Sequence, residues 1–244
     1  MKCKNNELDM TIVFIFVYVV AMSLGDTVSR SIGVEKSITV IVSFLITVFL
    51  FLYIKRKDLM EKYGLKRVEG KSREYLYYVP LLLIASVNIW FGVRMNMSIF
   101  ESTLYALTMI FAGIIEEILF RGMLYKEMAE NNEKRALIVS SLLFGVGHIV
   151  NLFNGSGAEL VSNMCQVIYA VSVGFMFVML FKKSGSILPC IITHSLLNVL
   201  STFNNEEKAN KYIIPVSLFM VVVSVLYSIY LYRKKTAKKY FPLA

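Results

Sequence analysis

Hydrophobic positions along this chain form long unbroken runs, and short polar segments separate them. A run of about 20 apolar residues is the length that an α-helix needs to cross the hydrocarbon core of a bilayer. The pattern therefore predicts an all-α, polytopic membrane protein with about eight transmembrane helices. The predicted spans are residues 8–25, 37–54, 75–93, 98–120, 136–153, 160–181, 186–203 and 212–232.

Composition agrees with this fold class. Hydrophobic residues make up 57% of the chain and the mean hydropathy is +0.62, which exceeds what is usual for a soluble domain. Segments between the runs are too short for a second domain, so residues 1–244 are expected to form a single transmembrane domain. The bilayer is then the chain's first partner, and no nucleic acid is expected because there is no folded polar domain to carry a basic surface.

The basic residues predict an orientation. The chain has 26 Lys and Arg against 17 Asp and Glu, a formal net charge of +9. If the N-terminus is placed inside, most of the Lys and Arg fall on inside segments, above all between residues 55 and 74. Cytoplasmic segments of membrane proteins carry such an excess. Both termini are therefore predicted to be cytoplasmic.

One apolar run contains charges that a membrane span would ordinarily exclude. Residues 111–125 read FAGIIEEILFRGMLY, with Glu116, Glu117 and Arg121 inside a predicted helix. Ionisable groups within membrane spans are costly and usually functional. Glu117 and Arg121 are four residues apart and share a helix face, so we expect them to pair. Glu116 projects about 100° away and is left as the candidate general base.

The two histidines of the chain also lie within apolar runs. His148 falls in the fifth predicted span and His194 in the seventh, where Asn198 follows one turn later. An imidazole and an amide on one helix face can both donate hydrogen bonds to an oxyanion. The alternative is that these groups are merely polar contacts between helices.

Small and aromatic residues surround the first histidine. Phe144 precedes His148 by one helical turn and is expected to pack beside it. Gly145 and Gly147 could let helices approach closely or leave room for a substrate.

The candidate residues are expected to meet at one depth, between the predicted helices 4, 5 and 7. At 1.5 Å per residue, Glu116, His148 and His194 fall on the order of 10–20 Å from the cytoplasmic face. A water-filled cavity must reach them if they hydrolyse a bond.

Two hydrolytic mechanisms fit these groups. The sequence has no GxSxG or HExxH motif, and the cysteines form no CxxC pair. Glu116 and His148 could activate water directly while His194 and Asn198 stabilise the oxyanion. Alternatively, Glu116, His148 and His194 could hold a divalent metal such as zinc, with water in the open position. Both predict cleavage of an amide, and an ion-coupled transporter or a non-proteolytic adaptor is the competing function.

Three ordered motifs resemble those of one known family. They are EExxxR at residues 116–121, FxxxH at 144–148 and HxxxN at 194–198. Together they resemble the CAAX protease and bacteriocin-processing (CPBP or Abi) family, which includes the type II CAAX prenyl endopeptidases. The motif-bearing core spans about residues 98–203.

The resemblance implies an intramembrane endopeptidase with a cytoplasm-facing cavity. It assigns catalysis to Glu116 and His148 and oxyanion stabilisation to His194 and Asn198, with Glu117 and Arg121 as a supporting salt bridge. It leaves open whether the enzyme is a metalloprotease or uses glutamate without a metal. The short loops resemble those of bacterial members, which implies a bacterial cell membrane. Expected substrates are membrane-associated peptides or proteins, in peptide maturation, signalling or bacteriocin self-immunity.

Overall fold

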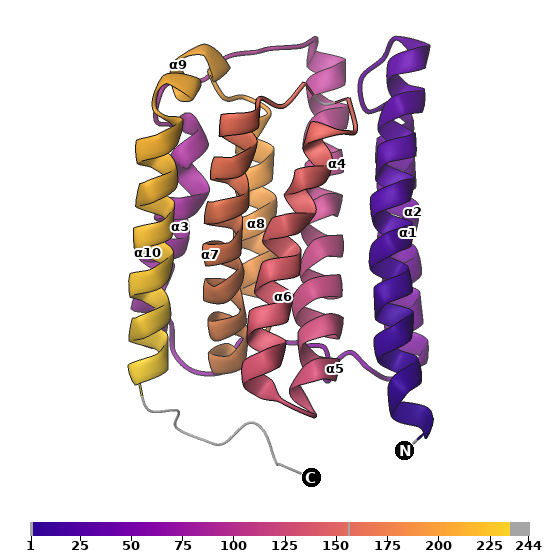
Figure 1. Ribbon diagram of the computed structural model, residues 1–244, viewed down its shortest axis with the longest axis vertical. Helices are drawn as coiled ribbons and strands as arrows, with labels where there is room; N and C mark the ends of the chain where they lie inside the picture. Colours follow the sequence, from indigo (N-terminus) through magenta and orange to yellow (C-terminus); the bar gives the residue numbers. More distant parts are fainter. Residues whose placement is uncertain (1, 156, 235–244) are drawn as a thin grey trace.

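A computed structural model of the chain describes residues 2–155 and 157–234, with side chains from residue 7 onward. Its helices run side by side along one axis (Figure 1). The principal elements are α1 (Lys2–Ile32), α2 (Ser37–Arg56), α3 (Val79–Ser86), α4 (Ile99–Glu117), α5 (Lys126–Ala129), α6 (Glu133–Gly147), α7 (Leu160–Ser184), α8 (Leu188–Ser201), α9 (Glu206–Lys211) and α10 (Ile213–Arg233).

The predicted all-α, polytopic membrane fold is confirmed, but two of the predicted spans form shorter helices than expected. Within the described residues, six helices are long and apolar enough to cross a bilayer. The predicted span 186–203 forms only α8, a 14-residue helix. The predicted span 75–93 is broken into the 3₁₀ turn η1 (Ser72–Tyr78), the short α3 and the 3₁₀ turn η2 (Val87–Ile89). The sequence showed where these runs were apolar but gave no sign that η1 and η2 interrupt one of them.

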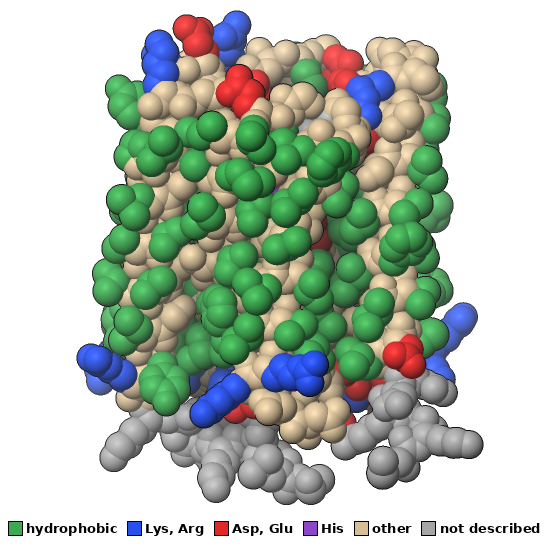
Figure 2. Space-filling model, viewed as in Figure 1, with side chains coloured by type: hydrophobic (Ala, Val, Ile, Leu, Met, Phe, Trp, Pro, Cys, Tyr) green, Lys and Arg blue, Asp and Glu red, His purple; other side chains and the backbone are tan. Residues whose placement is uncertain are grey.

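The outer surface of the bundle is hydrophobic between two charged ends (Figure 2). Large apolar side chains face outward, among them Phe16 at 68%, Ile192 at 67% and Leu226 at 62% exposed. Soluble monomers rarely expose such extended apolar surface. The chain is therefore an integral membrane protein.

Both ends of the described chain lie at the same end of the bundle (Figure 1). The long polar segment after α2 joins them there, whereas the α1–α2 turn and α9 lie at the opposite end. This arrangement is compatible with both termini in the cytoplasm, which stays a prediction from the charges. Lys235, Lys238 and Lys239 lie outside the described residues, as do the side chains of Lys2 and Lys4.

Local sequence signals explain where the central helices begin and end. Ser98 caps α4 by accepting a hydrogen bond from the Glu101 backbone N–H at 3.2 Å, and its hydroxyl donates to the Glu101 carboxylate at 2.7 Å. This is the Ser-x-x-Glu capping box. Asn132 caps α6 in a similar way, accepting from the Arg135 backbone N–H at 2.9 Å. Gly185 ends α7 in the left-handed conformation that glycine favours.

Candidate active site

The helix that carries the paired glutamates changes its geometry directly after them. α4 ends at Glu117, and the next eight residues form the π-helical segment η3 (Ile118–Tyr125) before α5 continues the same rod. All eight residues of η3 are buried, including Arg121. π-helical insertions occur frequently at functional sites. Glu116 and Glu117 therefore stand at a break in helical regularity that the sequence did not reveal.

Glu116 is held by a tyrosine from the first helix. Tyr18 of α1 donates a hydrogen bond from its hydroxyl to Glu116 Oε1 at 2.7 Å. The other oxygen, Oε2, lies 3.7 Å from His194 Nε2. The Glu116 side chain is 16% exposed, so its carboxylate is neither sealed in the core nor free in solvent.

Glu117 connects Arg121 to His194. Its Oε1 accepts a hydrogen bond from Arg121 Nη1 at 3.0 Å, in the pair that the four-residue spacing predicts. The same oxygen lies 2.8 Å from His194 Nδ1. Both Glu117 and Arg121 are fully buried. Glu117 thus orients the histidine as well as balancing the arginine, and the sequence predicted only the second of these roles.

Phe144 is the aromatic centre of the site. The Arg121 guanidinium carbon lies 3.8 Å from the centre of the Phe144 ring, close enough for a cation–π interaction. The ring also meets His148 and His194 edge to face, with centroids 5.5 Å and 5.4 Å away. Phe144 therefore packs against both histidines, rather than against His148 alone as the sequence suggested.

His148 lies at the point where α6 gives way to the 3₁₀ turn η4 (His148–Leu152). It is half-buried and lines the same cavity as Glu116. Its backbone carbonyl accepts a hydrogen bond from the Asn163 side chain of α7 at 2.8 Å. This bond fixes the backbone from which the imidazole projects.

Glycines allow the site helices to approach one another. A Cβ on Gly113 of α4 would lie 2.5 Å from Ser195 Oγ and 2.9 Å from Ser195 Cα of α8, which no unshifted structure tolerates. A Cβ on Gly145 of α6 would lie 2.3 Å from a methyl group of Val171 on α7. By contrast, Gly147 borders the cavity and has open space beside it. Gly145 thus allows two helices to approach closely, and Gly147 leaves open space beside the cavity.

Asn198 lies one turn beyond His194 on α8 and is half-buried. Among the described residues, its side-chain amide has no hydrogen-bond partner and does not line the cavity beside Glu116. The structure therefore joins Glu116, Glu117, Arg121, His148 and His194 around Phe144, and it sets Asn198 at the edge of this group.

A cavity of about 120 Å³ reaches Glu116 and His148. Such a volume can hold several water molecules. Figure 2 shows an acidic side chain recessed within the hydrophobic face of the bundle. The walls come from α1, from α4 with η3, and from α6 with η4; their polar members are Tyr18, Ser23, Asp26, Glu116, His148, Asn151 and Asn154.

The cavity extends toward the end of the bundle away from the termini. Asp26 lies in the last turns of α1, and Asn151 and Asn154 follow α6 at that same end (Figure 1). If the termini are cytoplasmic, this part of the cavity faces the opposite side of the membrane. Cytoplasmic termini and a cytoplasm-facing cavity, both expected from the sequence, are therefore not both compatible with this geometry.

The alternative set of metal ligands, Glu116, His148 and His194, is not assembled for an ion. Zinc requires three protein ligands at about 2.0–2.2 Å. Among the side chains of residues 7–155 and 157–234, no three from His, Cys, Asp or Glu gather closely enough to hold one. The contact between His194 Nδ1 and Glu117 does not decide this, because histidines that bind a metal through Nε2 commonly direct Nδ1 at a carboxylate. The residues as placed do not fit a metal, and no catalytic step is derived through one.

Comparison with known families points to the same segment of chain. Residues 98–200 match the sequence model of the Rce1-like type II CAAX prenyl endopeptidases. No curated protein and no solved structure matches the chain. The matched segment runs from α4 to α8, so Tyr18 and the rest of α1 lie outside it. The resemblance to the CAAX endopeptidases is thereby confirmed, and an intramembrane protease is supported.

Proposed function

We propose that this chain, which carries an Rce1-like type II CAAX prenyl endopeptidase segment, hydrolyses a peptide bond of a membrane-associated peptide or protein. The observation that carries the proposal is the placement of Glu116. Its carboxylate is fixed by Tyr18, lies 3.7 Å from His194 and borders a cavity that it shares with His148. A carboxylate at the edge of a water-sized space inside an apolar bundle suits a general base.

In the proposed reaction, Glu116 accepts a proton from a water molecule in the cavity. The water oxygen attacks the carbonyl carbon of the scissile bond, and the carbonyl electrons move to its oxygen. When this oxyanion collapses, the carbon–nitrogen bond breaks and Glu116 returns the proton to the leaving amine. His148 lines the same cavity and is proposed to position the attacking water.

His194 is proposed to stabilise the oxyanion through Nε2–H. Because Nδ1 is directed at Glu117, it is Nε2 that faces Glu116 and the reacting centre. The two carboxylates of Glu116 and Glu117 thus face the Arg121 guanidinium and the His194 ring. A buried group of charges is tolerated when it is paired in this way. Asn198, one turn further along α8, is proposed as the second oxyanion donor once a substrate is bound.

The proposed substrate is a peptide that reaches the site within the membrane. The apolar outer surface and the recessed cavity favour a chain delivered through the bilayer over a soluble peptide. The cellular role that we propose is maturation of a membrane-associated peptide, which includes bacteriocin self-immunity in a bacterial cell membrane. Passive binding of a peptide would not require a carboxylate fixed in this cavity, whereas ion-coupled transport can use one in a proton relay, so the cleavage assay is what separates hydrolysis from transport.

The function can be tested by following the cleavage of membrane peptides in cells that produce the wild-type chain or one of two variants. Glu116→Gln keeps the acceptor for Tyr18 and removes the base, whereas Glu207→Gln makes the same change at an exposed position on α9. We expect membrane peptides of producing cells to be cleaved with the Glu207→Gln variant and to stay intact with Glu116→Gln. Cleavage by both variants at the wild-type rate would contradict a glutamate-dependent protease.

A further inference from the structure

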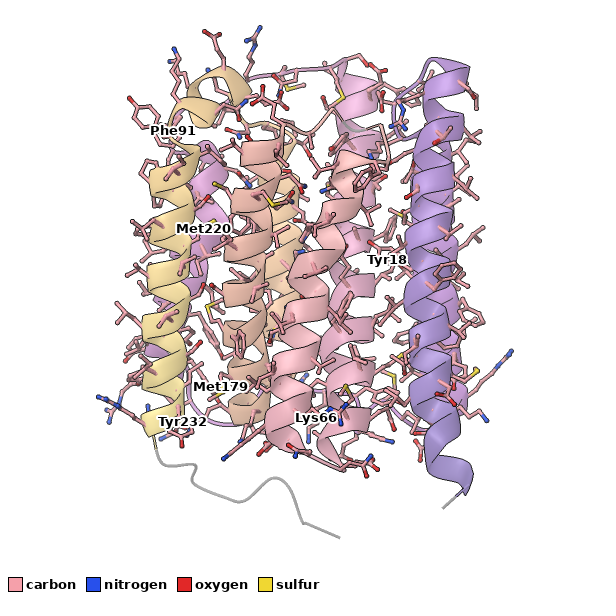
Figure 3. All side chains as sticks on the ribbon, viewed as in Figure 1. Tyr18, Lys66, Phe91, Met179, Met220 and Tyr232 are labelled. Atoms are coloured by element: carbon pink, nitrogen blue, oxygen red, sulfur yellow. The ribbon has the colours of Figure 1, made fainter. Side chains whose placement is uncertain are left out.

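Tyr18 is a buried residue of α1 that lies outside the family segment and yet contacts the candidate base. It is 7% exposed, and Figure 3 shows it on the side of α1 that faces the rest of the bundle. Its partner Glu116 is 98 residues away in the sequence. The contact therefore depends on how α1 packs against α2 and against η3, the segment that continues α4 directly after Glu116 and Glu117.

The bond between them has the character of a strong, orienting contact. A hydroxyl that donates to a carboxylate forms a charge-assisted hydrogen bond, typically 2.5–2.7 Å long and about twice as strong as a neutral one. The 2.7 Å separation fits that class. It occupies Glu116 Oε1, so Oε2 is the oxygen left toward His194.

A buried tyrosine hydroxyl usually finds some partner, so satisfying Tyr18 is the simpler explanation of this contact. The residues around Tyr18 favour a role in the site in addition to this hydrogen bond. α1 supplies a whole wall of the cavity, through Tyr18, Val19, Met22, Ser23 and Asp26. The helix is thus part of the reaction space, and Tyr18 is the point at which it contacts the base.

We infer that Tyr18 is a positioning residue for the proposed hydrolysis. It fixes the rotamer of Glu116 so that Oε2 faces the attacking water, and it makes a competent site depend on the docking of α1. The inference rests on the proposed function, since Glu116 is the group that Tyr18 positions. A displacement of about 1 Å at a reacting group can lower a rate about 100-fold, so the loss of this bond has a measurable consequence.

Kinetics of purified protein in lipid nanodiscs test the inference. The variants are Tyr18→Phe, which removes only the hydroxyl, and Tyr232→Phe, the same change at an exposed position on α10 (Figure 3). The probe is a fluorogenic, internally quenched peptide with a farnesylated C-terminal CAAX sequence, together with its unprenylated counterpart. We expect Tyr18→Phe to lower kcat per folded molecule about 10- to 100-fold with KM changed less than about twofold. Tyr232→Phe should match the wild type.

The outcomes separate this inference from the proposed function. Wild-type kcat in Tyr18→Phe, alongside an inactive Glu116→Gln, would overturn the role of Tyr18 and leave the protease standing. Wild-type cleavage by Glu116→Gln would instead overturn the function on which the inference rests. A rise in KM alone would also overturn the inference, because it would make Tyr18 a substrate contact.

A second measurement requires no substrate. Thermal unfolding of Tyr18→Phe, of Glu116→Met and of the double variant forms a double-mutant cycle. If the two side chains interact as described, the double variant loses less Tm than the sum of the two single losses. Additive losses would show that Tyr18 does not hold Glu116, and would overturn the inference whichever peptide the enzyme cleaves.

Discussion

Glu117 Oε1 lies 2.8 Å from His194 Nδ1, and this contact joins α4 to α8 at the centre of the bundle. The same oxygen accepts from Arg121, so one carboxylate oxygen orients an imidazole and neutralises a guanidinium. Because Glu117 and Arg121 are fully buried, neither can exchange its partner for solvent. The stability of the bundle and the orientation of the site are thereby linked.

Replacing Glu117 should damage both properties. Glu117→Gln keeps the shape of the side chain and leaves the Arg121 charge without a counter-ion in the core. Removing one partner of a buried ion pair costs about 3–5 kcal/mol. Thermal unfolding in lipid nanodiscs should show a large fall in Tm, while the exposed change Glu207→Gln should not. Equal Tm values for the two variants would contradict the role given to Glu117.

Phe144 should prove more important than an ordinary packing residue. Phe144→Leu retains apolar volume but removes the ring that contacts Arg121 and both histidines. Desolvated cation–π interactions contribute about 2 kcal/mol, so we expect a loss of that order together with reduced cleavage. Phe153→Leu is the matched control, because Phe153 is 81% exposed. Equal unfolding temperatures for the two variants would contradict the stabilising role given to the Phe144 ring.

Gly113 should resist even the smallest enlargement. Alanine is about 1 kcal/mol better than glycine inside a helix, so Gly113→Ala would stabilise α4 if there were room for a Cβ. The close approach of Ser195 instead predicts destabilisation and a displaced α8. Gly147→Ala serves as the control for stability alone, since its Cβ would meet open space. The comparison is made by thermal unfolding, and a raised Tm for Gly113→Ala would contradict the described helix contact.

Lys62, in the polar segment after α2, should contribute to the stability of the protein in a way that depends on pH. Burial acts to lower the pKa of Lys62, but hydrogen bonds to Glu127 and Glu7 outweigh it and raise the pKa above its ordinary value. A raised folded-state pKa stabilises the protein below the unfolded value, about 10.4, and this contribution fades as pH rises through the folded value. The Tm difference between wild type and Lys62→Met should therefore be steady from about pH 7 to pH 9 and should narrow in stronger alkali.

The exposed Lys71→Met variant is the control for Lys62. It should show little Tm difference at any of these pH values. A Lys62→Met deficit that widened with rising pH would contradict the sign of the shift.

The orientation of the bundle can be tested by labelling. In a variant whose native cysteines are replaced, Glu207→Cys and Lys71→Cys place single thiols at opposite ends (Figure 1). Cytoplasmic termini predict that an impermeant thiol reagent labels Glu207→Cys in intact cells and Lys71→Cys only after permeabilisation. The reverse pattern would place the termini outside and turn the cavity toward the cytoplasm.

Helical periodicity predicts side-chain contacts within one helix. It does not predict which side chains of different helices come into contact. The spacing of Glu117 and Arg121 predicts their pair, since four residues bring side chains together on any helix. The contact of Tyr18 with Glu116 has no such signal, because a tyrosine in an apolar span is unremarkable in sequence. It arises only when α1 packs against α2 and η3, which brings Tyr18 to Glu116 at the end of α4. The link from Glu117 to His194 was missed for the same reason.

The lengths of the helices and the direction in which the cavity extends could not be predicted from the sequence either. Hydropathy predicted apolar runs at 75–93 and 186–203, but it does not report 3₁₀ interruptions or a helix that begins late. The π-helical geometry of η3, whose eight residues are all buried, follows no residue type that the sequence makes evident. The cavity lies between residues of α1, of α4 with η3, and of α6 with η4, which only tertiary structure brings together.

The central claim is that Glu116 activates water for peptide hydrolysis, and isotopic labelling tests it most directly. Purified wild type, Glu116→Gln and Glu207→Gln are incubated in lipid nanodiscs with a farnesylated CAAX peptide and its unprenylated counterpart in H₂¹⁸O, and the products are weighed by mass spectrometry. We predict that wild type and Glu207→Gln release fragments with ¹⁸O in the new carboxyl terminus, and that Glu116→Gln releases at least 100-fold less, as expected for loss of a general base (about 10²–10⁴-fold). Release of ¹⁸O-labelled fragments by Glu116→Gln at the wild-type rate would contradict the claim.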